Sequence, residues 1–142
     1  MAYEKHLNPD IRTGRHCVFN MHIHLVFVTK YRHKVFQENH IKALTDIFTG
    51  ICIKFEAELK ECNGEADHIH LLIYYPPKVA VSRMVNTLKT VSSRMLRQKY
   101  PEIQDRYFKN VLWTPSYFAS SCGGAPLQII QEYVKSQQAI NL

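Results

Sequence analysis

The sequence predicts an α+β fold: a ferredoxin-like antiparallel sheet with two helices on one face, plus a C-terminal helix. The first observation is the element order, because strand and helix patterns follow one another as β-α-β-β-α-β. The second is the spacing of apolar residues, which is two in the strand segments and close to 3.6 in the helix segments. The third is the length of 142 residues, enough for one domain with its own core. We expect residues 1–16 to form an N-terminal tail and residues 17–142 to form a single domain.

The first half of the chain predicts a strand, a helix and a hairpin. Residues 17–29 alternate between apolar and polar side chains, which is typical of a strand with one face on a core. Apolar residues recur at three- and four-residue steps over 38–55, which indicates an amphipathic helix. The hairpin comprises a strand over 58–62, a tight turn at Asn63–Gly64, and a strand over 67–75 ended by Pro76–Pro77.

The second half predicts another helix, another strand and a terminal helix. The helix begins near residues 79–82 and ends before Pro101, and the strand covers 111–120, where Pro115 indicates an edge position or a bulge. Residues 120–142 then form a Gly123–Gly124 joint and a helix, with Pro126 in its first turn.

Two His-x-His pairs stand on the predicted strands, His22 with His24 and His68 with His70. The first and third strands of a ferredoxin-like sheet are neighbours, so both pairs can project from the open face opposite the helices. Residues i and i+2 of a strand point the same way, about 6.5–7 Å apart, so His68 and His70 can converge on one metal ion. Asp67 points to the other face and is a poor direct ligand unless the start of the strand is irregular. Partly exposed strand histidines with solvent or hydrogen-bond roles remain the alternative.

A metal ion held by two imidazoles keeps most of its coordination sphere open. Such openness suits a catalytic ion that also binds a phosphate oxygen of the substrate. Magnesium prefers oxygen ligands, whereas manganese also accepts imidazole. The expected cofactor is therefore a divalent metal, Mg²⁺ or Mn²⁺.

The C-terminal helix presents a phenol and an amide side by side. Tyr133 and Gln137 are one turn apart on one flank of the helix. They lie beside a stripe that should dock on the domain, formed by Leu127, Ile130 and Val134. A surface tyrosine beside a docking stripe is the simpler explanation for Tyr133 taken alone.

The charge distribution indicates a polyanionic partner. The net charge is +6, and the positive residues concentrate in 30–34 and 82–99. A solvated surface explains each residue singly, but as groups they favour DNA contact. The candidates are Lys30, Tyr31, Arg32, Lys34, Arg83, Lys89, Arg94 and Arg97. No apolar run approaches the roughly 20 residues of a membrane span, and the N-terminus lacks a secretion signal, so we expect a cytoplasmic protein.

Six segments together resemble insertion-sequence transposases of the HUH single-tyrosine class, where HUH denotes His, a bulky apolar residue, and His. The resemblance runs in order from about Cys17 to Gln138. Its segments are "TKYR", "DHIHLLI", "SSRMLRQ", "LWTPSYF", "GGAPL" and "QEYVKSQQ". It implies metal-dependent cleavage and joining of single-stranded DNA through a 5′-phosphotyrosine.

The resemblance also implies roles for single residues. His68 and His70 would bind the metal ion, Gln137 would be its third ligand, and Tyr133 would be the nucleophile. The pair His22 and His24 does not match the metal motif, and His24 falls where such proteins carry a strand residue facing the DNA. Members of the class act as homodimers on hairpin-bearing DNA ends, so the resemblance implies the same assembly and substrate here. Gly123 and Gly124 would be a hinge that permits the terminal helix to complete the partner's site, and a simple helix cap at a sharp turn is the alternative.

Two other functions remain open at this point. A replication or relaxase-type nickase would share the metal and the tyrosine, but usually sits in a longer chain. A non-catalytic nucleic-acid-binding module on the same fold would lack the chemistry altogether. Such RNA binders stack bases on aromatic residues of the central strands, where this sequence has histidines.

Overall fold

The structure is a computed structural model of the chain, and it describes residues 11–14, 16–107, 110–121 and 127–140. A four-stranded antiparallel sheet has the strand order β4-β5-β3-β6. Its strands are β3 (His22–Val28), β4 (Glu58–Glu65), β5 (His68–Tyr74) and β6 (Phe118–Ser120). The helices are α1 (Glu38–Lys54), α2 (Val81–Lys99), α3 (Pro101–Gln104) and α4 (Leu127–Ile140), with a 3₁₀ turn η1 (Lys30–Arg32). This is the predicted ferredoxin-like order, with the first and third strands of the motif as central neighbours.

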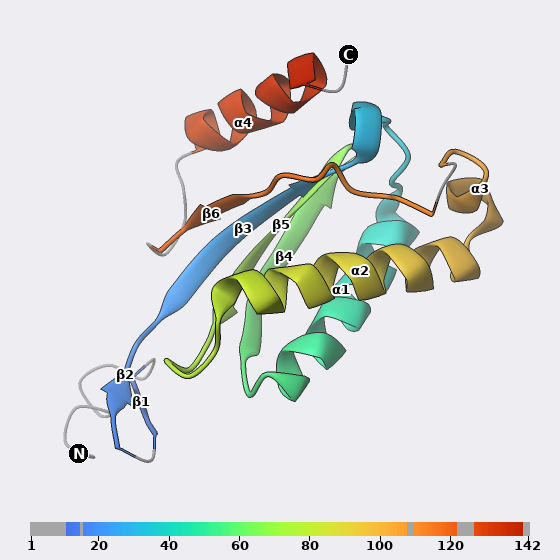
Figure 1. Cartoon of the computed structure of the whole chain (residues 1–142). Coiled ribbons are helices and arrows are strands. Elements are labelled where there is room, and N and C mark those ends of the chain that lie inside the picture. The colour runs from blue at the N-terminus through green and yellow to red at the C-terminus, as the bar shows by residue number, and fades with distance from the viewer. Residues whose placement is uncertain (1–10, 15, 108–109, 122–126, 141–142) are drawn as a thin grey trace.

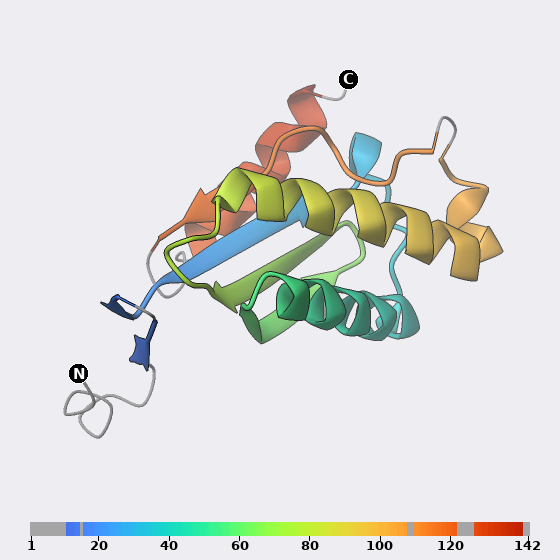
Figure 2. The ribbon, with the colours of Figure 1, turned by 60° about the horizontal axis from the view of Figure 1, so that its bottom comes forward.

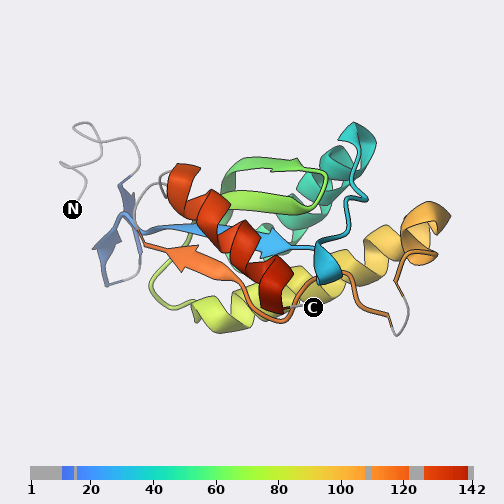
Figure 3. The same ribbon diagram turned by 90° about the horizontal axis from the view of Figure 1, so that it is seen from above.

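The helices form two separate layers on the sheet. Helices α1 and α2 lie side by side against one face, whereas α4 lies on the opposite face (Figures 1 and 2). Seen from above, α4 crosses β3 and leaves most of the β4–β5 hairpin uncovered (Figure 3). The face opposite α1 and α2, which the sequence predicted to be open, is therefore partly covered. None of the described helices is both long and apolar enough to cross a membrane.

The core lies between the sheet and the α1–α2 layer. Alternation places Leu25 and Phe27 of β3, and Ile69, Leu71 and Ile73 of β5, on this face, and each is fully buried. They pack against apolar side chains of the two helices, including Leu44, Phe48, Ile51, Met84 and Leu88. The other side chains of β3 and β5, including the histidines at 68 and 70, are thereby directed to the α4 face.

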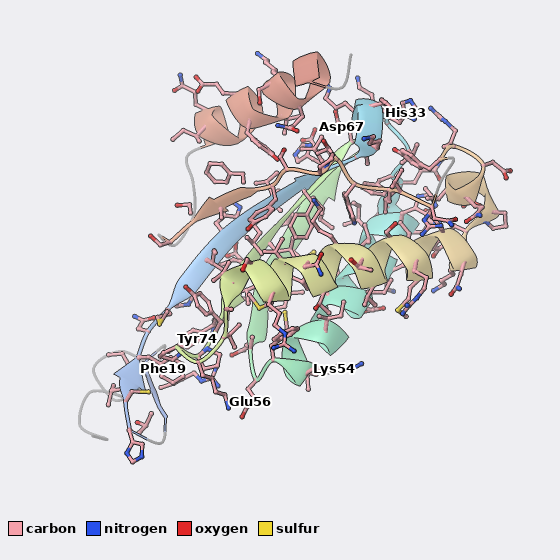
Figure 4. All side chains as sticks on the ribbon, in the orientation of Figure 1. Phe19, His33, Lys54, Glu56, Asp67 and Tyr74 are labelled. Carbon is pink, nitrogen blue, oxygen red and sulfur yellow. The ribbon has the colours of Figure 1, made fainter. Side chains whose placement is uncertain are left out.

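The predicted first strand is broken, and the predicted tail contains a strand. Residues 18–19 form β2 (Val18–Phe19), which pairs with β1 (Arg12–Thr13) in a separate small sheet. The Arg12 guanidinium lies 5.3 Å and 5.0 Å from the ring centres of Phe19 and Tyr74. The Tyr74 hydroxyl donates to the Phe19 carbonyl at 2.7 Å, which ties the small sheet to the end of β5 (Figure 4).

The predicted turn at Asn63–Gly64 is wrong. Both residues lie inside β4, where Asn63 pairs with His70 and Gly64 pairs with Ile69, and the chain turns at residues 66–67 instead. A Cβ on Gly64 would meet the His68 carbonyl oxygen at 2.6 Å and Ile41 Cδ1 at 2.9 Å. The glycine is therefore needed for a close approach of β5 and α1, not for a turn.

We expect Gly64→Ala to destabilise the protein by about 1–3 kcal/mol, because the clash with backbone cannot be relieved by a side-chain rotation. Urea unfolding followed by circular dichroism measures this change. Gly50→Ala in α1 is the control, since nothing lies within 4 Å of its added Cβ. Alanine is the better helix former, so that variant should be more stable than the parent by up to about 1 kcal/mol. Equal stability of both variants would contradict the close approach.

The last predicted strand is shorter than residues 111–120. Strand β6 covers three residues, and an isolated bridge joins Thr29 to Trp113. The pairing is interrupted at Pro115, which has no N–H to donate to a ladder. The carbonyls of residues 114–116 turn instead toward the side chain of Lys89 on α2.

Candidate active site

The two histidines of the β5 motif lie together on the α4 face of the sheet. In the antiparallel register Val28 pairs with His68 and Val26 with His70. The two imidazole rings are stacked at 6.3 Å between centres with an interplanar angle of 25°. The His24 ring lies 5.6 Å from the His70 ring, edge to face. The spacing rule for strands thus placed His24, His68 and His70 on one face correctly.

A carboxylate orients the first of these histidines. Asp67 is 8% exposed, and its Oδ1 accepts a hydrogen bond from His68 Nδ1 at 2.9 Å, while Arg32 Nε lies 3.3 Å from Oδ2. Burial raises the pKa of Asp67, but the hydrogen bond and charge of His68 and the charge of Arg32 outweigh it and lower the pKa overall. Asp67 is therefore a carboxylate at neutral pH, and Nδ1 of His68 carries the proton. The Nε2 lone pair is left for a metal ion.

Sequence reasoning missed this role of Asp67. We expected the side chain to point to the opposite face, as it would in a regular strand, and to be a poor ligand unless the start of the strand is irregular. Asp67 is a turn residue, however, and its carbonyl accepts from both the N–H and the hydroxyl of Thr29, at 3.0 Å and 3.2 Å. A turn frees the side chain from strand alternation. The signal in the sequence was an aspartate directly before a His-x-His pair, since ligand histidines often donate their other ring N–H to a carboxylate.

We expect Asp67→Asn to weaken Mn²⁺ binding by about 10- to 100-fold, because a neutral amide no longer fixes the His68 tautomer. Titration calorimetry with MnCl₂ on the DNA-free protein measures the affinity. Asp46→Asn on the exposed surface of α1 is the control and should leave the affinity unchanged. If the Asp67 variant binds Mn²⁺ as tightly as the parent, the carboxylate does not support a metal ligand.

Burial keeps the neighbouring imidazoles neutral. For His70, burial and the positive charge of His68 lower the pKa, and the opposing effects of Glu61 and Glu65 are smaller. Burial and His70 likewise lower the pKa of His24. Neutral imidazole is the form that coordinates metals. His24 itself is only 6% exposed, between Leu72 and Ser120 on the adjacent strands, so the structure places it under the site rather than on its surface.

The phenol and the amide of α4 share one hydroxyl partner. Ser116 Oγ donates to Gln137 Oε1 at 2.7 Å and lies 2.9 Å from the Tyr133 hydroxyl. Because Ser116 has one proton, which it gives to Gln137, the phenol donates to Ser116. Thr114 Oγ1 also donates to Gln137 Oε1, at 3.2 Å, and Gln137 is 2% exposed. Burial raises the pKa of Tyr133.

Helix α4 packs directly over the strand segment that pairs with the histidines. Val134, which follows Tyr133, is 8% exposed and packs against Val26 and Val28, the cross-strand partners of His70 and His68. The Tyr133 ring also lies 5.9 Å from the ring of Phe118 on β6. The predicted docking of Val134 is confirmed. The side chains of Leu127 and Ile130, and the predicted hinge Gly123–Gly124, lie outside the described residues.

The basic residues after β3 form an exposed corner near the histidine face. Tyr31 is 55% exposed and takes the left-handed conformation, with φ 60°, as does Arg32, with φ 52°. Strained backbone of this kind is found where side chains are presented for function. Lys30 Nζ lies 5.4 Å from the Tyr31 ring centre, and Lys34 follows in the loop to α1. Figure 4 shows Asp67 at this same end of the sheet.

The basic residues of α2 divide into two kinds. Arg83 and Arg94 are exposed. Arg97 donates to Ser93 Oγ at 3.2 Å and to Asn110 Oδ1 at 3.1 Å, and Lys89 donates to three carbonyls of residues 114–116. A DNA phosphate would have to displace these intramolecular contacts of Lys89 and Arg97.

Two histidines are the candidate ligands for a metal ion in the described part of the chain, without a third His, Cys, Asp or Glu that could hold the ion with them. In the described parts of the chain, no three His, Cys, Asp or Glu side chains are grouped to hold a metal ion. The pair His68 and His70, with Nδ1 of His68 held by the Asp67 carboxylate, offers imidazole nitrogens to a divalent ion that accepts them. The remaining ligands would be Gln137 Oε1, once released from its hydroxyl donors, and the substrate.

Comparisons with known proteins show the family to which the chain belongs. The family described as "Transposase IS200 like" matches residues 17–137. The ISDra2 transposase TnpA of Deinococcus radiodurans is 30% identical over 128 residues, covering 90% of this chain and 91% of that protein. The IS200 transposase of Salmonella typhimurium is 31% identical over 128 residues, covering 90% and 84%.

Two solved structures share the fold. A candidate transposase from Deinococcus radiodurans R1 superposes with a TM-score of 0.81 at 29% identity, covering 89% of this chain and 97% of that one. A REP-associated tyrosine transposase bound to a REP hairpin has a TM-score of 0.55 at 11% identity, covering 87% and 67%, and supports the fold alone. The match over residues 17–137 and the relatives of similar length lead to one conclusion: the chain belongs to the IS200-like transposases, enzymes that cleave DNA and transfer its strands.

Proposed function

We propose that this transposase cleaves and rejoins single-stranded DNA at insertion-sequence ends through a 5′-phosphotyrosine on Tyr133, with a divalent metal and without ATP. One observation carries the proposal: α4 packs Val134 onto the strand residues that pair with His68 and His70, so the phenol lies over the same sheet face as the imidazoles. A nucleophile and a metal-ligand pair over one face is the arrangement that phosphoryl transfer requires.

The bond changes explain why no ATP is required. The Tyr133 oxygen attacks the scissile phosphorus and loses its proton, the P–O bond to the preceding 3′ oxygen breaks, and that oxygen leaves as a 3′-hydroxyl. The phosphotyrosine conserves the energy of the broken ester. A 3′-hydroxyl of another DNA end can then attack the same phosphorus and release the phenol. The sequence has no GxxxxGK[ST] loop for a nucleoside triphosphate.

The metal ion would be held by His68, His70 and Gln137. When bound, Mg²⁺ or Mn²⁺ would neutralise charge on the scissile phosphate and align it for attack. Asp67 keeps His68 in the tautomer that coordinates, and burial keeps His70 neutral. Gln137 must turn its Oε1 away from Thr114 and Ser116 to become a ligand. The same change would free the hydroxyl proton of Ser116, which already accepts from the Tyr133 phenol.

The DNA would approach along the exposed corner beside β3. Tyr31 offers a face for stacking an unpaired base, and Lys30 and Lys34 offer charge to the backbone. Arg83 and Arg94 are exposed on α2, on the other face of the sheet, and are further candidates for DNA contact. We propose hairpin-bearing ends as the substrate, in line with the hairpin bound by the REP-associated relative, and a homodimer as the working assembly.

A denaturing gel tests the proposal. The protein is incubated with labelled single-stranded DNA bearing the end of its own element, with MgCl₂ or MnCl₂, and a covalent protein–DNA band is expected. EDTA should remove the band. DNA binding without an adduct in either metal would favour a non-catalytic binding module.

A further inference from the structure

Lys89 joins the helix layer on one face of the sheet to the segment that holds α4 on the other. Its Nζ donates to the carbonyls of Thr114, Pro115 and Ser116, at 2.7, 3.0 and 3.3 Å. An ammonium group has three protons, so all its donors are used. The ammonium also lies 6.0 Å and 5.9 Å from the ring centres of Phe27 and Tyr117. Burial lowers the pKa of Lys89 to about 8, so the group is still mostly charged at pH 7.

The regular strand pairing is interrupted along residues 114–116, and the carbonyls of these residues accept from Lys89. The Thr114 N–H bonds to the Val28 carbonyl at the end of β3, and Pro115 has no N–H. Strand β6 resumes the pairing only at Phe118. We call residues 114–116 the seat, since the hydroxyls of Thr114 and Ser116 form hydrogen bonds with Tyr133 and Gln137 of α4.

The seat contacts α4 through side chains and α2 through backbone. The hydroxyls of Thr114 and Ser116 bond to Gln137, and Ser116 also bonds to Tyr133. The carbonyls of the same residues bond to Lys89. A shift of the carbonyls would therefore move the hydroxyls, and with them the phenol and the amide.

We propose that Lys89 is a positioning residue for strand cleavage: it fixes the seat so that Ser116 and Thr114 hold Tyr133 and Gln137 over the histidine face. The inference rests on the proposed function, because it assigns Lys89 a role through the nucleophile and the third metal ligand. It differs from the expectation that Lys89 contacts DNA. A phosphate contact would raise affinity for DNA, whereas a positioning role acts on the rate once DNA is bound.

Lys89→Met is the first test, because methionine keeps the apolar stem and removes the charge. At saturating single-stranded DNA, we expect the single-turnover rate of adduct formation to fall about 10- to 100-fold, the effect of a nucleophile displaced by about 1 Å. The Kd for the DNA, from fluorescence anisotropy, should change less than about twofold. Lys89→Arg keeps donors and charge and should recover part of the rate. Lys54→Met, which removes the same charge from the far end of α1 (Figure 4), should match the parent in both.

A double-mutant cycle separates this role from a general effect on the fold. If Lys89 acts through the seat, Lys89→Met should slow a Thr114→Val/Ser116→Ala variant by less than about twofold, since the hydroxyls that it positions are gone. Rate losses of Lys89→Met and of Thr114→Val/Ser116→Ala that multiply in the combined variant would overturn the inference. So would a raised Kd with an unchanged rate at saturation, which would make Lys89 a DNA contact. If Lys89→Met does not fold by thermal melting, Lys89→Gln takes its place, since the amide removes the charge and cannot donate to all three carbonyls.

The parent protein distinguishes this inference from the proposed function. If the parent forms the adduct and Lys89→Met forms it at the same rate, only the role of Lys89 is overturned. No adduct in the parent, with either metal, overturns the proposed function and the inference together.

Discussion

Tyr133→Phe is expected to abolish the covalent DNA adduct, with a fall in cleavage rate of about 10⁴-fold or more, because phenylalanine keeps the ring and removes the attacking oxygen. The ring of the variant can still pack beside Phe118, so the position of α4 should be kept. The measurement is single-turnover cleavage of single-stranded DNA on a denaturing gel. DNA affinity should stay within about twofold of the parent, since the phenol carries no charge for the backbone.

The ionisation of the phenol explains why the rest of the site is needed. With a pKa near 10, a phenol is about 0.1% ionised at pH 7, which costs roughly 4 kcal/mol if the phenolate is the nucleophile. Burial raises the pKa of Tyr133, so in the observed position the cost is larger still. Tyr100→Phe, in the helix layer on the other face, is the matched control and should cleave like the parent. An adduct of normal yield in Tyr133→Phe would mean that another residue is the nucleophile.

His68→Ala is expected to lower metal-dependent cleavage by about 10³-fold or more while leaving DNA binding nearly intact. Alanine removes one of the two imidazoles and also leaves the Asp67 carboxylate without its His68 partner. Cleavage rate and DNA affinity are measured separately, each in MnCl₂ and in EDTA. In EDTA, the parent and the variant should be equally inactive.

His16→Ala controls for the loss of a histidine, since that side chain is exposed in the loop between β1 and β2. It should retain full activity. Loss of DNA binding in His68→Ala, with normal turnover of the DNA that still binds, would contradict a metal role for His68.

The fold was predictable because its signals are local and strong. Alternation over β3 and β5 and the helical spacing over α1 and α2 set which faces are apolar, and the element order then selects the sheet order. The prediction of a turn at Asn63–Gly64 was wrong because it rested only on the preference of these two residues for turns. The register of β4 against β5 and the approach of Ile41 to Gly64 decide the turn, and these are contacts between elements.

The candidate site was predictable where it depends on one strand or one helix. The shared face of His68 and His70, and the shared flank of Tyr133 and Gln137, follow from the periods of the two structures. The roles of Asp67, Ser116 and Lys89 depend on tertiary contacts. Lys89 and Thr114 are separated by 25 positions and Ser116 and Gln137 by 21, and no local pattern connects them.

Mapping the covalent adduct by mass spectrometry tests the central claim most directly. After nuclease and trypsin digestion, Tyr133 lies in the segment 110–135, which also contains Tyr117, so fragment ions must locate the nucleotide within the peptide. We predict a 5′-nucleotide on Tyr133, formed with Mn²⁺ and absent with EDTA. A nucleotide on Tyr117 or on any other residue, or the same yield without a divalent metal, would contradict a metal-dependent attack by the α4 phenol over the histidine face.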